Sequence, residues 1–294
     1  MQLRTINSLY ISLYFDVPRP KALLGHQHFH RLLDEIRDVY KLQKTTFDNF
    51  YISAAGSESS VMQRLKRELG DALNLPEGSE NGDLLIRLRR ANKGWEILIR
   101  ITPRPHATRL WRVCNFEGAL NGPVASSMIQ LSKPSREDIV VNLACGSGTI
   151  MIERLLSTGV SKIIGCDNDE LALACARENL NASFVTGTDL ELIRTDVKSL
   201  PLPSNFANRL YADLPFGQLV GSHQDNIKQY PQIFDEAARI ATPDAIFTVI
   251  THEVKLIESV LANNRSWYAQ QIIKVSLRGL HPRIYVLSKR NGSQ

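Results

Sequence analysis

The second half of the sequence alternates short apolar runs with amphipathic segments, and this alternation constrains the fold more than any other feature. Apolar residues three and four apart predict helices, whereas short apolar or alternating runs predict strands. Strands that alternate with helices form a parallel, doubly wound sheet. The expected helices cover residues 123–132, 148–157, 169–180, 230–240 and 252–263, and the expected strands cover residues 138–144, 161–166, 191–195, 207–213, 245–251, 267–277 and 283–289.

The last two expected strands are joined only by the segment from Gly279 to Pro282. Parallel neighbours need a crossover of about a dozen residues or more, so these two strands must pair antiparallel. We therefore expect an α/β sheet that is parallel except for an antiparallel hairpin at its C-terminal end.

The first hundred residues follow a different order. The expected strands cover residues 8–16, 47–55, 84–90 and 95–102, and one helix covers residues 28–42. A second helix has an apolar stripe from Val61 to Leu73. Pro103 and Pro105 then interrupt regular structure. We expect a smaller α+β domain over residues 1–105 and the doubly wound domain over residues 106–294.

A basic run lies at the end of the smaller domain. Between Leu84 and Arg112 the only acid is Glu96, and a field of that sign attracts polyanions such as RNA. The alternative is a solvated strand face without a partner. The basic residues of the run are Arg87, Arg89, Arg90, Lys93, Arg100, Arg104, Arg109 and Arg112.

Composition excludes several other classes of protein. No apolar run reaches the roughly 18 residues of a membrane span, and the N-terminus lacks the plan of a signal peptide, so we expect a cytoplasmic protein without membrane contact. His26, His28 and His30 have no acids at ligand spacing, and we predict no metal site. The cysteines form no C-x-x-C pair and are expected to be reduced core residues; they are Cys114, Cys145, Cys166 and Cys175.

A glycine turn follows the strand expected at 138–144, with the sequence CGSGT over residues 145–149. In open parallel sheets, ligands bind beyond the carboxyl ends of the strands, where such a turn leads into the next helix. Asp167 ends the next strand and is placed to hold a ribose diol, although it also suits the N-cap region of the following helix. Asp196 follows the third strand and is either an acceptor for an adenine amine or an ordinary loop residue.

The sequence DLPF, from Asp213 to Phe216, ends the fourth strand at the same edge. An amine conjugated to a purine or pyrimidine is a poor nucleophile because its lone pair is delocalised. The Asp213 carboxylate and a carbonyl near Leu214 can hold the two amine hydrogens and favour a pyramidal nitrogen. Stacking of Phe216 on the base would suit a flipped-out or unpaired nucleotide. The alternative is a strand-ending turn at Pro215 with a core phenylalanine.

Four segments together resemble one family. Residues 117–289 are similar to class I S-adenosylmethionine-dependent methyltransferases, and within them to the RNA guanine-N2 methyltransferases associated with THUMP domains. The resemblance implies a Rossmann-like sheet, S-adenosylmethionine as cofactor, and methyl transfer to an exocyclic base amine of structured RNA, with guanine N2 in tRNA or rRNA as the leading target. Residues 47–102 resemble a reduced THUMP-type RNA-binding unit. The four segments are GALNGPVASSMIQLS (118–132), VNLACGSGTIMIE (141–153), GCDNDELALACARENL (165–180) and DLPFG (213–217).

The resemblance also implies roles for individual residues. The segment from Asn142 to Gly148 would hold the methionine part of the cofactor, Asp167 its ribose and Asp196 its adenine edge. Asn142 stands where the family usually has an acid, and Leu214 stands where the family motif has its first proline, as in some members of the guanine-N2 group. The residues expected to contact the cofactor are Asn142, Ala144, Cys145, Gly146, Ser147, Gly148, Asp167, Asn168, Asp196 and Asp213, and those expected to hold the target amine are Asp213, Leu214, Pro215 and Phe216.

Three other functions stay open at this point. A DNA amino-methyltransferase would present the same chemistry to adenine N6 or cytosine N4. A non-catalytic RNA-binding protein would follow if Asn142 had ended cofactor binding. An NAD-dependent oxidoreductase fits poorly, because Met151 occupies the third glycine position of the dinucleotide fingerprint.

Overall fold

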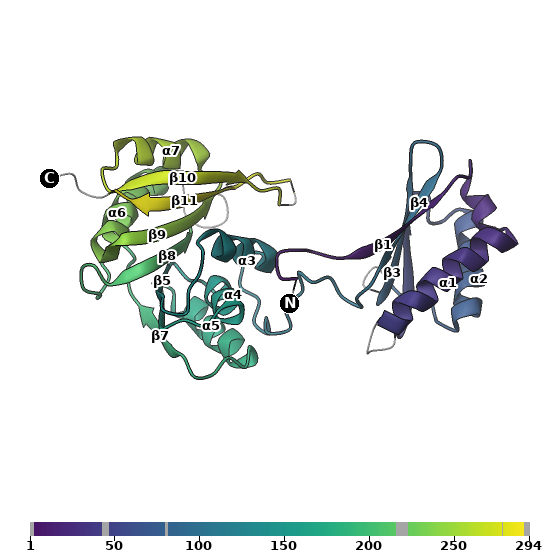
Figure 1. Ribbon diagram of the computed structural model, residues 1–294, viewed down its shortest axis with the longest axis horizontal. Coiled ribbons are helices and arrows are strands. Elements are labelled where there is room, and N and C mark those ends of the chain that lie inside the picture. Colours follow the sequence, from purple (N-terminus) through teal and green to yellow (C-terminus); the bar gives the residue numbers. More distant parts are fainter. Residues whose placement is uncertain (1–2, 43–46, 80–81, 216–222, 278, 291–294) are drawn as a thin grey trace. The chain divides into compact units, whose positions relative to one another are not determined.

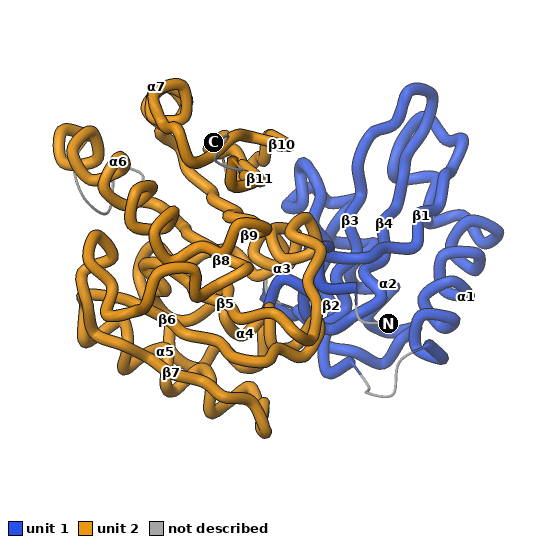
Figure 2. The backbone as a smooth tube through the Cα atoms, turned by 60° about the vertical axis from the view of Figure 1, so that its left-hand side comes forward, with its two compact units in different colours: residues 1–108 blue, residues 109–294 orange. Residues whose placement is uncertain are grey.

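The computed structural model describes residues 3–42, 47–79, 82–215, 223–277 and 279–290. The chain divides into two compact units, residues 1–108 and 109–294 (Figure 2). The boundary expected after residue 105 lies within segment 101–108, which contains no helix or strand.

Unit 1 is built on a four-stranded sheet of order β1-β4-β3-β2. Its strands are β1 (Tyr10–Phe15), β2 (Phe50–Ala54), β3 (Leu84–Arg90) and β4 (Trp95–Arg100). Strand β4 pairs antiparallel with β1 and β3, whereas β2 pairs parallel with β3. The short 3-10 helix η1 (Pro20–Leu24) precedes α1 (His26–Leu42), and α2 (Ser60–Leu73) follows β2.

Only one face of this sheet is covered by helices (Figure 1). Leu13 and Phe15 of β1 are buried in a core shared with α1 and α2, whereas Ser12 and Tyr14 are exposed. Successive side chains of a strand point to opposite faces, so the residues between the buried positions lie on the face without helices. Unit 1 therefore presents an open sheet surface.

Unit 2 contains a seven-stranded sheet of order β10-β11-β9-β8-β5-β6-β7. The neighbours from β9 to β7 in that order pair parallel, and β11 pairs antiparallel with both β9 and β10. The doubly wound sheet with an antiparallel C-terminal hairpin is thus confirmed. The strands are β5 (Ile139–Leu143), β6 (Lys162–Asp167), β7 (Asp189–Arg194), β8 (Ala207–Asp213), β9 (Ala241–Thr251), β10 (Trp267–Lys274) and β11 (Arg283–Lys289).

Helices cover both faces of this sheet, and each face has its own core. Helices α3 (Gly122–Leu131), α4 (Thr149–Ser157) and α5 (Glu170–Ala182) pack around Met128, Ile152 and Leu173. Helices α6 (His223–Ile240) and α7 (Val254–Asn263) pack around Phe234 and Ile257. Burial on both faces explains why the strands read as nearly continuous apolar runs.

Helix α6 begins at His223, whereas the sequence predicted a start near residue 230. Pro231 lies inside the helix, and the residue before a proline disfavours helical geometry, which misplaced the expected start. Packing overrides that local preference, since Asn226, Tyr230 and Phe234 are buried on one side of α6.

Within the described ranges, no helix is long and apolar enough to cross a membrane. In the same residues, no three His, Cys, Asp or Glu side chains gather in a group that could hold a metal ion.

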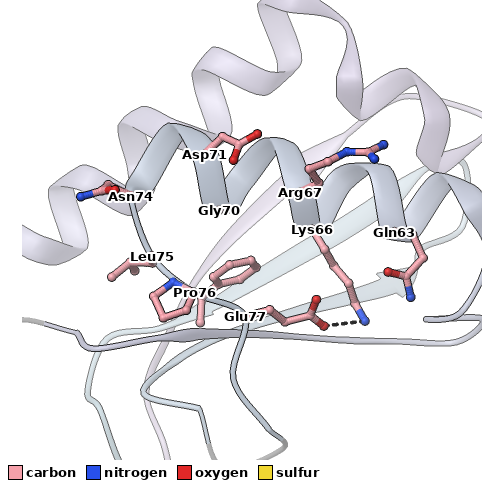
Figure 3. Close-up of a pocket in the computed structure, with 10 residues that line it drawn as sticks. Gln63, Lys66, Arg67, Gly70, Asp71, Asn74, Leu75, Pro76 and Glu77 are labelled. Carbon is pink, nitrogen blue, oxygen red and sulfur yellow. Dashed lines mark ion pairs between the residues drawn. The ribbon is translucent and has the colours of Figure 1, made fainter.

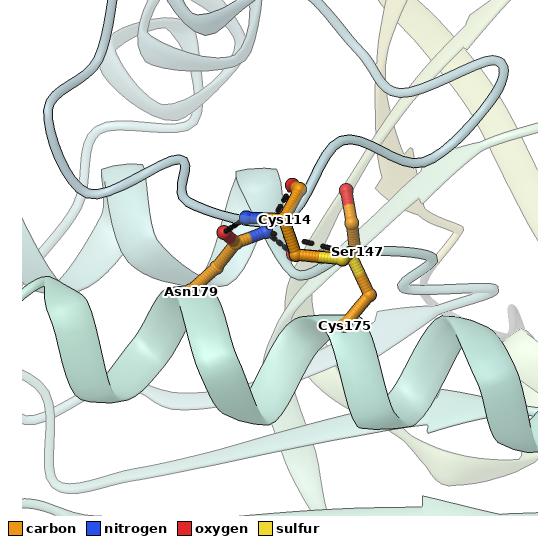
Figure 4. The surroundings of a disulfide bond; sticks show 4 residues. All are labelled: Cys114, Ser147, Cys175 and Asn179. Atoms are coloured by element: carbon orange, nitrogen blue, oxygen red, sulfur yellow. Dashed lines mark hydrogen bonds between the residues drawn. A yellow bond between two sulfur atoms is a disulfide. The ribbon is translucent and has the colours of Figure 1, made fainter.

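The expectation of four reduced cysteines is wrong for two of them. Cys114, before α3, and Cys175, on α5, form a disulfide across 61 residues of sequence (Figure 4). Sequence spacing carries no information on a contact made by folding, which is why the pair was missed. Cys145 and Cys166 are free and buried, and burial raises the pKa of the Cys166 thiol to about 12. Such thiols are protonated and unreactive at neutral pH.

Reduction of the disulfide is expected to destabilise the protein measurably. Closing a loop of this length restricts the unfolded chain, with an effect of about 2–4 kcal/mol on the free energy of unfolding. Urea unfolding of the oxidised and reduced protein measures this difference, with the Cys114→Ser/Cys175→Ser variant as a reference that reductant should not change. Equal midpoints for the oxidised and reduced protein would contradict the prediction.

Candidate active site

The expected ligand site lies at the topological switch point of the unit 2 sheet. From β5 the chain continues outward through β6 to β7 on one side, and β8 and β9 lie on the other. Leu143 of β5 is level with Ala212 of β8 and Cys166 of β6. The sheet therefore brings three features together at the carboxyl ends of neighbouring strands. They are the turn after β5, Asp167 at the end of β6 and Asp213 at the end of β8. Ligands of doubly wound sheets bind in the crevice at this point.

The glycine turn has an unusual backbone. Ala144, Gly146 and Gly148 all have positive φ angles, of 51°, 54° and 80°. Gly148 is the N-cap of α4, and a Cβ there would lie 3.3 Å from Ala176 Cβ. A Cβ on Gly146 would meet nothing within 4 Å, so this residue faces open space. The turn thus needs glycine for its geometry and leaves room for a ligand above the start of α4.

Asp167 lies beside this turn and is held by two backbone groups. Its Oδ2 accepts a hydrogen bond from Gly146 N at 2.8 Å, and its Oδ1 accepts one from Asp169 N at 3.0 Å. The N-cap of α5 is Asp169, whose side chain accepts from Leu171 N, so Asp167 is not the cap itself but supports the cap residue through its Oδ1. A carboxylate has about four lone-pair sites, which leaves acceptor capacity on both oxygens for a diol.

The two other expected cofactor contacts on this side are more exposed. Asn168 is exposed, and its carbonyl accepts a hydrogen bond from Arg194. Asp196 is 53% exposed and pairs with Lys198 at 3.1 Å. Thr195 N donates to Asp167 O, which places the segment that carries Asp196 directly next to Asp167.

Asp213 is the last residue of β8, and its environment is the most unusual at this edge. Its Oδ1 is shielded from solvent and has no hydrogen-bond partner among the described residues. Burial raises the pKa of Asp213 to about 7. A carboxyl group whose pKa lies near neutral pH is typical of functional sites. A buried carboxylate with a purely structural role would be expected to have a hydrogen-bond or ion-pair partner.

The turn after Asp213 is fixed by residues that the sequence did not identify. The Pro215 carbonyl accepts hydrogen bonds from Asn226 Nδ2 at 3.0 Å and from Tyr230 OH at 2.9 Å. Tyr230 OH also contacts Thr251 Oγ1 at 2.7 Å, which ties the turn to the end of β9. Buried Asn226 and Tyr230 stand four residues apart on α6, and only a correct start of that helix would have revealed them. Phe216, the fourth expected residue of this motif, lies outside the described residues.

Two further buried polar atoms near the switch point have no partner among the described residues. They are Asn142 Oδ1 and Ser147 Oγ. Asn142 is fully buried on β5, and its Nδ2 donates to Leu143 O and Tyr211 O at 3.3 Å. Buried polar groups are normally paired, so these two oxygens are acceptors that a polar ligand at this edge could engage. The expected cofactor contacts Ala144, Cys145 and Gly148 belong to the same turn, and Cys145 is buried.

The basic run is not one surface. The Arg100 guanidinium is buried and donates to backbone carbonyls, including Pro103 O at 2.6 Å. Arg109 forms a buried ion pair with Glu153, and Arg112 donates to Leu120 O and Thr149 Oγ1. These arginines stabilise internal loops and their contacts with α4, which a count of charges cannot reveal. The run keeps Arg87, Arg89, Arg90, Lys93 and Arg104 exposed.

A polar groove of about 660 Å³ lies elsewhere, between α2 and segment 74–77 of unit 1 (Figure 3). Lys66 in this groove pairs with Glu77 at 2.7 Å, and this hydrogen bond raises the pKa of Lys66. Arg67 and Asp71 also line it with opposite charges. The groove has no excess charge and lies on a different unit from Asp213, so we assign it no part in the chemistry.

Comparison with known families settles the class of unit 2. The model of the UPF0020 family, described as an RMKL-like methyltransferase domain, matches residues 109–283, more than half of the chain. The chain belongs to this family. The UPF0020 match spans the glycine turn, Asp167, Asp196 and Asp213.

Curated relatives of this UPF0020 member are RNA methyltransferases. The human tRNA (guanine(6)-N(2))-methyltransferase THUMP3 is 30% identical over 181 residues, which cover 57% of this chain and 36% of that protein. The tRNA (guanine(6)-N2)-methyltransferase of Methanocaldococcus jannaschii is 26% identical over 217 residues, covering 61% of this chain and 56% of that protein. The chain thus spans only about a third to a half of the length of these relatives.

Solved structures show the same fold over the whole chain. TrmN from Thermus thermophilus aligns with 97% of this chain and 83% of its own, with a TM-score of 0.77 and 21% identity. SMU.472, whose structure contains SAH, aligns with 98% of this chain and 85% of its own, with a TM-score of 0.68 and 14% identity.

Proposed function

We propose that the chain transfers a methyl group from S-adenosylmethionine to an exocyclic base amine of structured RNA, with guanine N2 of tRNA as the leading target. The observation that carries this proposal is the shielded, unpartnered Oδ1 of Asp213 at the switch point, beside the glycine turn and Asp167. The names of the curated relatives support the choice of guanine N2.

The residues at the edge fit this cofactor. Asp167 keeps acceptor capacity for the ribose hydroxyls, and the glycine turn is open above Gly146. The unpaired oxygens of Asn142 and Ser147 can accept hydrogen bonds from the α-amino group of the methionine part. Asn142 lacks the charge of the usual acid but keeps a buried acceptor, so the substitution is compatible with binding. Half-exposed Asp196 is accessible to an adenine amine.

Asp213 and the Leu214 carbonyl would hold the two hydrogens of the target amine and localise its lone pair on nitrogen. Bound S-adenosylmethionine would supply an electrophilic methyl group, and the amine nitrogen that accepts it would release a proton. Asp213, with its pKa near 7, can accept that proton. The Pro215 carbonyl is already engaged by Asn226 and Tyr230, which keeps the turn rigid. Positioning of this kind supplies much of the rate of a displacement reaction.

Labelling with methyl-labelled S-adenosylmethionine tests the function. The protein would be incubated with bulk RNA and, separately, with duplex DNA, and labelled nucleosides identified by mass spectrometry, with Asp213→Ala as the inactive control. Label in N2-methylguanosine that depends on Asp213 is the expected result. Label in N6-methyladenine or N4-methylcytosine of DNA would instead establish the DNA amino-methyltransferase. Absence of label together with absence of cofactor binding would favour the non-catalytic RNA-binding protein.

The open sheet face of unit 1 is the surface that we propose for RNA contact. Arg87 lies over the Tyr10 ring at 5.7 Å, and Arg89 is 64% exposed beside it on β3. Tyr14 is 46% exposed on the same face. Glu96 on this face pairs with Arg89 Nε at 2.6 Å, and the other donors of the exposed Arg89 guanidinium remain for a phosphate. An arginine over a partly exposed tyrosine ring, with a second exposed tyrosine on the same face, suits both phosphates and unpaired bases.

The Arg87→Ala/Arg89→Ala variant is expected to bind RNA more weakly and with less salt dependence. Loss of two phosphate contacts lowers the slope of log K against log[salt] by about 1.5. Filter binding across a salt series measures the slope. Arg37→Ala on α1, on the opposite side of the sheet, is the matched control. An unchanged slope would place the RNA on another surface.

A further inference from the structure

One buried side chain outside the CGSGT sequence forms a hydrogen bond with the backbone of the glycine turn. Asn179 on α5 is fully buried. Its Nδ2 donates to the Ser147 carbonyl at 3.2 Å and to the Cys114 carbonyl at 3.1 Å, and its Oδ1 accepts from Cys114 N at 2.9 Å (Figure 4). One amide thus joins the turn to the segment before α3.

That segment, residues 109–121, is here called the strap. It is anchored at three places on the helices that frame the turn. Arg109 pairs with Glu153 of α4 at 2.7 Å, and Arg112 donates to the hydroxyl of Thr149, the first residue of α4. Cys114 is bonded to Cys175, four residues before Asn179 on α5. The strap is therefore held in place at several points rather than free to move as a loop. Asn179 bonds directly to its backbone at Cys114.

The same face of α5 also limits the turn from the side. Ala176 lies 3.3 Å from where a Cβ on Gly148 would stand. Ser147, between Gly146 and Gly148, can be held only through its backbone or its hydroxyl, and its hydroxyl has no partner among the described residues. The Asn179 bond to the Ser147 carbonyl thus helps to orient the middle of the turn, together with the bond from Gly148 N to Cys145 O at 3.0 Å.

We infer that Asn179 is a positioning residue for the cofactor turn, holding Ser147 and its two glycines in the conformation that receives S-adenosylmethionine. This inference rests on the proposed function. Asn179 does not touch the cofactor; it acts through the Ser147 carbonyl. The amide is required because the two carbonyls need donors while Cys114 N needs an acceptor, a combination that a carboxylate cannot provide.

The Asn179→Asp variant tests this assignment. It keeps the size and the acceptor of the side chain but replaces both donors by a charge that faces two carbonyls. Lost hydrogen bonds of this kind change affinity about ten- to a hundredfold. Isothermal titration with S-adenosylhomocysteine, which needs no RNA, should show that increase in Kd. The KM for S-adenosylmethionine should rise in parallel, whereas kcat at saturating cofactor stays close to that of the wild type.

Controls separate positioning from general damage. Asn181→Asp places the same charge on an exposed position of α5 and should bind as the wild type does. Asn179→Ser shortens the side chain so that it can no longer bond to the Ser147 carbonyl, and it adds no charge. It replaces Asn179→Asp in the same titration if that variant does not fold. Folded Asn179 variants with the affinity of the Asn181 control, or with lower kcat at unchanged Kd, would overturn the inference. Failure of the wild type to bind cofactor would instead remove the proposed function and the inference with it.

Discussion

Replacement of Asp213 by alanine is expected to lower kcat for methyl transfer about 10²- to 10⁴-fold, the contribution of a positioned acid or base. The physical reason is that Asp213 Oδ1 is shielded and unpaired at the carboxyl end of β8, where an amine of the substrate would be its partner. Initial rates at saturating methyl-labelled cofactor measure the effect. Asp244→Ala, at an exposed position of the neighbouring strand β9, is the matched control. An Asp213→Ala variant with wild-type kcat would exclude the residue from the reaction.

The raised pKa of Asp213 also sets the direction of the pH dependence. The pKa is about 7 in the folded protein against a usual value of 3.8, so the ionised carboxylate accumulates only as pH rises through 7. We expect kcat/KM to rise with pH across this range, and the residual activity of Asp213→Asn to lack that limb. The folded state binds the proton more tightly than the unfolded chain, so stability is lost between pH 4 and 7 and stays low above it. Asp213→Asn should therefore be more stable than the wild type at pH 8, which urea unfolding at that pH measures.

Asp167→Ala is expected to weaken cofactor binding about 10²- to 10⁴-fold, because two hydrogen bonds to a charged group contribute about 1.5–3 kcal/mol each. The same carboxylate orients Gly146 N, so the turn also loses an anchor. Titration with S-adenosylhomocysteine measures the change in Kd. Asp189→Ala, at the exposed start of β7, is the control. Retention of wild-type affinity in Asp167→Ala would exclude the predicted ribose contact.

The parts of the structure that could be predicted from sequence are those that depend on the local pattern of apolar, polar and glycine residues. The turn at residues 145–148 and the strand that precedes it followed from an apolar run ending in two glycines, and the C-terminal hairpin followed from a link too short for a crossover. The observed order β10-β11-β9-β8-β5-β6-β7 then brings Asp167 and Asp213 to one edge. Their roles at that edge stay predictions that the variants above test.

The features that were missed depend on contacts between distant segments. Cys114 and Cys175 meet only because the strap crosses α5, and Arg100 is buried only because carbonyls at the ends of strands converge on it. In sequence, Arg100 is indistinguishable from the exposed Arg87. Asn226 and Tyr230, the partners of the Pro215 carbonyl, were not identified because Pro231 suggested that the helix starts later than it does. Tertiary packing decided each of these cases.

The bond between Cys114 and Cys175 closes residues 114–175 into a covalent ring that contains β5, the glycine turn, α4 and β6. A peptide bond cut anywhere inside this ring leaves both fragments joined, so a nicked molecule keeps its full mass until a reductant is added. Strands β5 and β8, which flank the switch point, would stay on one molecule after such a cut. The disulfide therefore keeps the two fragments of unit 2 covalently joined after a cut within residues 114–175, as long as the sulfurs remain oxidised.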